Sequence, residues 1–188
     1  MAIQIQDGTG KGYVASVCSE NRLRVVSVAQ SVESHANQHD GQAYHLSFSQ
    51  SPTANDDCIL YMQNDDDDDV MVEGFYLYVS GACEVYVQLG DTGTRNSGTS
   101  LTPVNANAGS GNTATGTFEK GADLDGGSAT LTGGSEFMRW IFTAETATDF
   151  YNLECDCVLP ENQTLTLWCD TSTVTVTGVA VFFYHGGC

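Results

Sequence analysis

The sequence has few basic residues and no long hydrophobic run. Six Lys and Arg stand against 24 Asp and Glu, for a formal net charge of −18. Nucleic acid is therefore not expected as a partner, because a protein needs a basic surface to displace counterions from phosphates. An anionic membrane surface is disfavoured for the same reason. No run reaches the roughly 18 apolar residues that span a bilayer, and the first residues lack the pattern of a signal peptide, so we expect synthesis in the cytoplasm.

Helix signals are also scarce, which favours an all-β fold. Apolar residues do not recur at three- and four-residue spacing over any long window, and Gly, Thr, Ser, Asn and Asp interrupt the chain throughout. About eight to ten strands are expected, a pattern typical of a β-sandwich or jelly roll. The clearest strand-like runs are 21–28, 42–48, 58–63, 70–79, 83–89, 137–144, 150–159, 164–170 and 173–184.

The connections between these runs also carry expectations. A polar link containing His35 and His39 joins the first two runs. Runs 70–79 and 83–89 are separated by Ser80-Gly81-Ala82, which predicts a hairpin. Run 83–89 alternates, with its valines expected in the core and Glu84, Tyr86 and Gln88 in solvent. The stretch 90–134 is rich in Gly, Thr, Asn, Ser and Ala, and we expect long ordered loops with short strands there.

The seven cysteines are odd in number and irregularly spaced, and most lie inside strand-like runs. A reduced Cys in such a place behaves as a small buried hydrophobe, so we expect mostly core thiols made in a reducing compartment. Cys155 and Cys157, with Cys169, His185 and Cys188, would be an alternative zinc site. A one-residue spacing within a strand is more simply explained by two core cysteines.

The densest charge feature is Asp65 to Asp69, with Asp56 and Asp57 nearby. Carboxylates are hard ligands suited to Ca²⁺, but five consecutive side chains of an extended segment point to alternate sides and cannot converge on one ion. A solvated, self-repelling loop is the preferred interpretation. We expect no bound metal or other cofactor.

Catalytic patterns are not recognisable either. No Ser or Cys lies on an elbow beside a His and a carboxylate, and the Gly-rich pieces lack the Lys-Ser/Thr of a phosphate loop. The chain is therefore expected not to be an enzyme. Four aromatic side chains are candidates for a shared ligand platform or a subunit contact: Tyr76, Tyr78, Tyr86 and Trp168. Half-buried aromatics in the core of a sandwich are the commoner alternative.

Three parts of the sequence together resemble tailed-bacteriophage virion proteins of the head-decoration, or capsid cement, type. The first part contains DGTGKGYVASV (7–17), NRLRVVSV (21–28) and GQAY (41–44). The second is LTPVNANAGSGNT (101–113), and the third is VLPENQTLTLW (158–168), followed by FFYH (182–185). The resemblance implies a structural subunit on the outer capsid surface of the virion, made in the host bacterial cytoplasm. It also implies a jelly-roll-like β-sandwich with an extended N-terminal arm, the major capsid protein as partner, and association as a homo-oligomer, a trimer.

The residues add detail to this expectation. Residues 1–28 would form the capsid-anchoring arm and 29–188 the sandwich body. Lys11, Arg22 and Arg24 form the one small basic group and are the expected capsid contacts. The main alternative is a carbohydrate- or receptor-binding jelly-roll module of a head or tail fibre. A third alternative is a glycan lyase or hydrolase, with acidic residues in a sandwich cleft.

Overall fold

The structure is a computed structural model, and it describes residues 31–96 and 98–185. The chain divides into two units, Met1–Ser31 and Val32–Cys188. The arm expected over 1–28, including its strand-like run 21–28, lies outside the described residues.

The structure is mostly β, with 52% strand and 5% helix. The elements in chain order are α1 (Val32–His35), the π-helix η1 (Ala36–Asp40), β1 (Ala43–Gln50), β2 (Asp57–Asn64), β3 (Asp69–Val79), β4 (Cys83–Leu89), β5 (Thr99–Ser100), β6 (Val104–Asn105), β7 (Gly116–Lys120), β8 (Ser135–Phe142), β9 (Asp149–Leu159), β10 (Thr164–Cys169) and β11 (Val176–His185). The predicted all-β class is confirmed, as are the short strands within 90–134.

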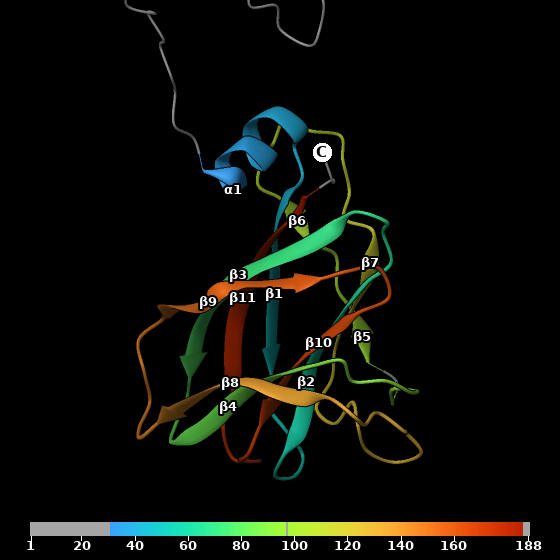
Figure 1. The fold of residues 1–188 in the computed structure, drawn as a ribbon. Coiled ribbons are helices and arrows are strands. Elements are labelled where there is room, and N and C mark those ends of the chain that lie inside the picture. The colour runs from blue at the N-terminus through green and yellow to red at the C-terminus, as the bar shows by residue number, and fades with distance from the viewer. Residues whose placement is uncertain (1–30, 97, 186–188) are drawn as a thin grey trace, which may run out of the picture. The chain divides into compact units, whose positions relative to one another are not determined.

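The strands form two antiparallel sheets with the order β6-β1-β11-β3-β9 and β5-β7-β2-β10-β4-β8 (Figure 1). Eight of the longer strands, β1–β4 and β8–β11, pair in nested order along the chain. The first of them pairs with the last, β1 with β11. The inner pairs follow the same rule: β2 with β10, β3 with β9, and β4 with β8. A long double-stranded hairpin folded over itself produces this order, which is that of a jelly roll. The predicted jelly-roll-like sandwich is therefore confirmed.

The predicted hairpin of 70–79 and 83–89 is wrong. Strand β3 pairs with β11 and β9 in one sheet, whereas β4 pairs with β10 and β8 in the other. The connection Ser80-Gly81-Ala82 bonds instead to the segment before β11, where Ser80 N donates to Thr175 O at 3.0 Å. Because each strand buries one face in the same core, placing the two strands in opposite sheets satisfies the alternation as well as a hairpin does.

The polar link around His35 and His39 is helical, as α1 and η1, whereas the sequence showed no helix signal. The segment is too short for a helical period to appear in the sequence. It ends at Gly41, whose φ of 63° is left-handed, and a Cβ there would lie 2.5 Å from Ser110 Oγ. Ala36 packs with Ala43 and Phe183. Within the described part of the chain, no helix is long and apolar enough to cross a membrane.

The core lies between the sheets, and a second apolar cluster covers the outer face of the six-stranded sheet. That cluster contains Cys58, Tyr61, Tyr86, Leu124, Leu131 and Trp168. Tyr86 was expected in solvent, but its side chain is only 5% exposed. The physical reason is that Leu124 and Leu131, from the stretch expected to form ordered loops, pack over this face and exclude water from it.

Candidate functional site

The basic residues of the described body are held by its own acidic and polar groups. These residues are Arg95, Lys120 and Arg139. The Nε of Arg95 donates to a carboxylate oxygen of Glu119 at 2.7 Å, and Arg139 pairs with both Glu84 and Glu136. The body therefore presents a mainly acidic surface. The predicted capsid contacts Lys11, Arg22 and Arg24 lie outside the described residues.

The first four aspartates of the run form the loop between β2 and β3, and Asp69 begins β3. All five side chains are exposed or half-buried. Asn64 Oδ1 accepts a hydrogen bond from Asp66 N at 2.9 Å, and Asp66 Oδ1 accepts one from Asp68 N at 3.2 Å. The bond from the Asp68 N–H holds the pKa of Asp66 below its ordinary value, because it stabilises the carboxylate. The loop is solvated, as expected, and these local turns also order it.

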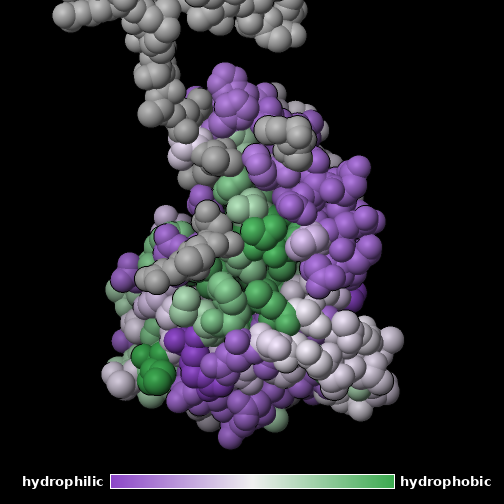
Figure 2. Space-filling view, in the orientation of Figure 1, coloured by the Kyte–Doolittle hydropathy of each residue, from purple (hydrophilic) through white to green (hydrophobic). Residues whose placement is uncertain are grey.

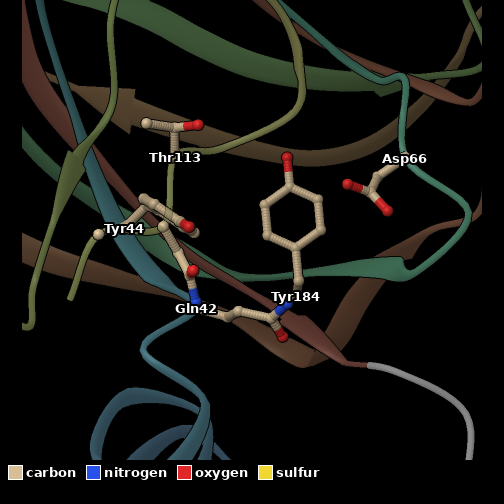
Figure 3. Close-up of a pocket in the computed structure, with 7 residues that line it drawn as sticks. Gln42, Tyr44, Asp66, Thr113 and Tyr184 are labelled. Carbon is tan, nitrogen blue, oxygen red and sulfur yellow. The ribbon is translucent and has the colours of Figure 1, made fainter.

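A polar pocket opens beside this loop. It has a volume of about 320 Å³ and is lined by Gln42, Tyr44, Asp66, Gly111, Asn112, Thr113 and Tyr184. The hydroxyl of Tyr184 lies between Asp66 on one side and Thr113 on the other (Figure 3). Tyr44 and Tyr184 form the buried floor, with side chains only 1% and 3% exposed.

Hydrogen bonds to the backbone fix the walls of the pocket. Tyr184 Oη donates to Thr115 O at 2.6 Å, and Tyr184 N donates to Gln42 O at 3.0 Å. Asn105 Nδ2 donates to Asn112 O at 3.1 Å and to Gly41 O at 2.7 Å. The loop before β7 is thereby tied to the start of β1, so the pocket exists before any ligand enters.

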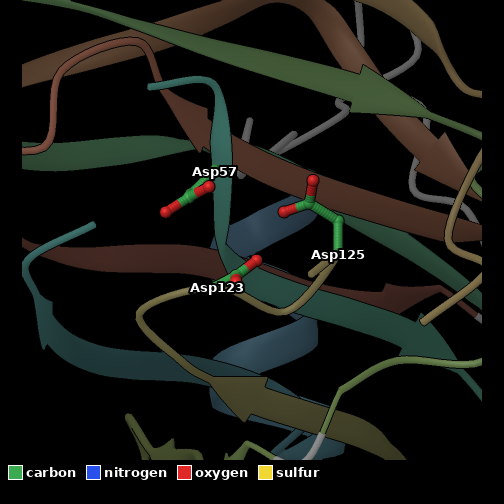
Figure 4. A group of neighbouring side chains, drawn as sticks. All are labelled: Asp57, Asp123 and Asp125. Atoms are coloured by element: carbon green, nitrogen blue, oxygen red, sulfur yellow. The ribbon is translucent and has the colours of Figure 1, made fainter. Parts of the chain in front are cut away.

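Three carboxylates face one another at a different place, where β2 begins (Figure 4). One oxygen from each of Asp57, Asp123 and Asp125 lies within 4.8 Å of the others. Backbone N–H groups already bind two of them: Ala54 N donates to Asp57 Oδ2, and Cys58 N to Asp125 Oδ1, each at 2.6 Å. Ca²⁺ takes about six to eight oxygen ligands, so these carboxylates offer a partial ligand set.

We expect Asp125→Asn to raise the melting temperature at pH 7 in the presence of EDTA. Asn keeps the Oδ1 acceptor for Cys58 N and removes one of three neighbouring negative charges. Burial, with the charges of Asp123 and Asp57, raises the pKa of Asp125. Its proton therefore stabilises the fold below the ordinary pKa of Asp, about 4, and this contribution is lost as pH rises through the raised value.

Thermal unfolding of both proteins between pH 4 and pH 7 measures this effect. The stability gained by the variant should grow with pH over this window. A variant that melts below the wild type in EDTA would contradict the repulsion argument. A Ca²⁺-induced rise in the melting temperature of the wild type alone would show that the three carboxylates hold a cation.

The described cysteines follow the core interpretation. Cys58, Cys83, Cys157 and Cys169 are buried free thiols, and burial raises the pKa of Cys157 to about 11. Cys18, Cys188 and the side chain of Cys155 lie outside what is described. Among the described residues, Cys157, Cys169 and His185 do not gather into a metal-ligand group, so the zinc alternative gains no support there.

The four aromatic residues expected to share a platform do not lie on one surface. Tyr86 and Trp168 stack with ring centroids 6.1 Å apart in the covered cluster on the six-stranded sheet. Tyr76 lies on the other sheet, is 42% exposed, and packs 4.7 Å from the ring of Phe150. The candidate platform is therefore not formed by Tyr86 and Trp168, which are buried, as the alternative interpretation has it.

One side of the sandwich is apolar and open. Strands β8 and β9 are edge strands of the two sheets, and exposed hydrophobic side chains lie on them: Phe137 (39%), Ile141 (69%) and Val158 (43%). Figure 2 shows hydrophobic side chains gathered in the middle of this face, surrounded by hydrophilic ones. The opposite edges, β5 and β6, are only two residues long each. We call the β8 and β9 side the apolar edge; Ile141 and Val158 lie there on the outward faces of the two sheets, each next to a buried core residue of its strand, Phe142 and Cys157.

Fold and sites together define a jelly-roll β-sandwich with an acidic surface, a polar pocket and one apolar edge. Comparison with family models, curated proteins and solved structures finds no match. The pocket and the group around Asp125 were not predicted from the sequence. The one available signal in the sequence for the Asp125 group was Asp123-Leu124-Asp125, in which two carboxylates lie two residues apart.

Proposed function

We propose that this chain is a structural virion protein that decorates and stabilises the outer capsid surface of a tailed bacteriophage. The jelly-roll strand order is shared by viral capsid and lectin domains, and three parts of the sequence resemble head-decoration proteins. Because fold alone does not fix function, the proposal depends on the surface. The observation that carries it is the apolar edge on a body that is otherwise acidic.

The charge distribution supports an outward-facing position. Residues 31–188 hold 22 of the 24 acidic residues and three of the six basic ones. Packaged DNA repels such a body, whereas the arm carries Lys11, Arg22 and Arg24, which complement an acidic partner. We assign attachment to the major capsid protein to this arm, 1–28, and self-association to the body.

The apolar edge is the surface through which copies of the body associate. Like-charged bodies approach each other most easily where charge is sparse and apolar area can be buried. Strand β8 has a bulge at Phe137, where the register with β4 shifts between Val87 and Gln88. Because a bulge disrupts an exposed ladder, side chains rather than strand addition make the contact.

We expect Ile141→Asp to weaken self-association by about tenfold or more, since a buried Ile contributes about 1.5–3 kcal/mol. Added salt should strengthen association of the wild type, because it screens the repulsion between acidic bodies. Sedimentation equilibrium at two salt concentrations measures both effects.

Val104→Asp is the matched control, because Val104 is 67% exposed on β6, at the far edge of its sheet. That variant should associate like the wild type. Equal loss of association in the two variants, or none in either, would place the contact elsewhere.

The alternative, a carbohydrate- or receptor-binding module, is favoured by the exposed Tyr76 and its neighbour Phe150, since sugars stack on such rings. We give the chain no catalytic role. Co-sedimentation of the purified chain with undecorated particles separates the two roles. A decoration protein binds the particles, whereas a glycan-binding module binds immobilised glycans and leaves particles bare.

A further inference from the structure

We propose that the polar pocket binds a guanidinium group, the head of an arginine side chain. This inference goes beyond the virion role and does not depend on it. The pocket's volume of about 320 Å³ is near the lower end of ligand sites, about 300–1,000 Å³. It therefore suits one side-chain head rather than an extended chain of sugars.

Several groups around the pocket can accept hydrogen bonds. Asp66 contributes a carboxylate, and Gln42 and Thr113 contribute an amide and a hydroxyl, each of which can accept. Tyr184 Oη gives its proton to Thr115 O, so the Oη atom keeps only acceptor capacity. A guanidinium offers five N–H donors in a planar fork and no acceptor, which complements this set.

Charge selects a cation for the same place. None of the seven residues that line the pocket is positively charged, and Asp66 belongs to a run of five aspartates. The Asp68 N–H bond keeps Asp66 ionised at neutral pH. An anion would be repelled, whereas a cation forms a charge-assisted hydrogen bond with the carboxylate, which a neutral sugar forms without the added ionic attraction.

A guanidinium fits better than an ammonium. It is planar and weakly hydrated, so it loses less on leaving water for a pocket with a tyrosine floor. The hydrogen bonds that Asn105 and Tyr184 make to the backbone hold the walls in place, which lowers the entropic cost of binding.

Titration of the full chain with N-acetyl-arginine amide, followed by ¹H–¹⁵N NMR shifts, tests the proposal. We expect saturable shifts at the pocket residues with a Kd on the order of 1 mM, corresponding to a few charge-assisted hydrogen bonds. N-acetyl-citrulline amide, a neutral isostere, should not bind. N-acetyl-lysine amide should bind more weakly than the arginine compound.

Asp66→Asn should weaken arginine binding by about tenfold or more. Its matched control is Asp69→Asn, which removes the same charge from the same aspartate run at an exposed residue that does not line the pocket. The amide introduced by Asp66→Asn keeps the Oδ1 acceptor for Asp68 N, so the loop should fold normally. If that variant does not fold, Thr113→Val, at an exposed residue, provides the test and should also weaken binding.

Several results would overturn the inference. Equal weakening by Asp66→Asn and Asp69→Asn would show attraction to the charge of the aspartate run without a pocket. Binding of citrulline as tight as that of arginine would remove the role of the cation. Shifts with a methyl glycoside and none with the arginine compound would make this a sugar site.

Discussion

Replacing Asp91 with Ala should lower the free energy of unfolding by about 3 kcal/mol, as expected when a buried charged group is removed from its partners. The Asp91 side chain is only 1% exposed. Its Oδ1 accepts a hydrogen bond from Gly134 N at 2.9 Å, and its Oδ2 accepts one from Thr166 Oγ1 at 2.5 Å. Trp168 Nε1 donates to the same Thr166 hydroxyl at 2.8 Å, so the substitution leaves a chain of buried donors without its final acceptor.

The structural effect should reach beyond this site. Asp91 ties both ends of the segment 91–134 to β10, and this segment supplies Leu124 and Leu131 to the cluster over Tyr86 and Trp168. Loosening it should expose Trp168 to water and shift its fluorescence to the red.

Urea unfolding followed by tryptophan fluorescence and by circular dichroism measures both effects. Glu161→Ala, at an exposed acidic residue in the turn before β10, is the control and should change stability by less than about 0.5 kcal/mol. A loss below about 1 kcal/mol for Asp91→Ala would mean that the buried network contributes no more than an ordinary hydrogen bond.

Strand positions could be predicted from the sequence because alternation reports burial directly. In run 150–159, Tyr151, Leu153, Cys155, Cys157 and Leu159 alternate with Asn152, Glu154, Asp156 and Val158. The structure buries Leu153, Cys157 and Leu159 of that set. The pairing of strands was harder to predict. A three-residue connection fits a hairpin as well as a crossing between sheets. Strands β3 and β4 lie in different sheets, because their pairing depends on partners far along the chain, such as β11 and β10.

The sites were less accessible to sequence reasoning for the same reason. Gln42, Asp66, Thr113 and Tyr184 come from four separate segments, and only the tertiary fold brings them to one pocket. The burial of Tyr86 depends on Leu124 and Leu131, which lie in a stretch expected to form ordered loops but with no signal for where those loops would pack. The aspartate run was visible in the sequence, yet the carboxylates that gather closely, Asp57, Asp123 and Asp125, are others.

Removing the arm should abolish capsid attachment while leaving the body folded. A protein that begins at Ala29 keeps every described strand, since β1 begins at Ala43. It loses Lys11, Arg22 and Arg24, half of the six basic residues, and with them the charges that complement an acidic partner. We expect circular dichroism and the melting temperature to be nearly unchanged. The affinity for undecorated particles should fall about a hundredfold or more, which corresponds to a loss of about 3 kcal/mol in binding free energy.

A full-length triple variant, Lys11→Gln with Arg22→Gln and Arg24→Gln, separates charge from length. If the basic group carries attachment, this variant should bind weakly, and the salt dependence of binding should be lost. A truncated protein that binds particles as well as the full chain would assign attachment to the jelly-roll body instead.

The central claim is that this jelly roll lies on the outside of a phage capsid. Electron microscopy of the intact particle tests it most directly, by locating density that fits the two-sheet body. We expect such density on the outer capsid surface, with the apolar edges of neighbouring copies in contact. Density for this chain at the tail or inside the capsid, or particles that lack it, would contradict the claim.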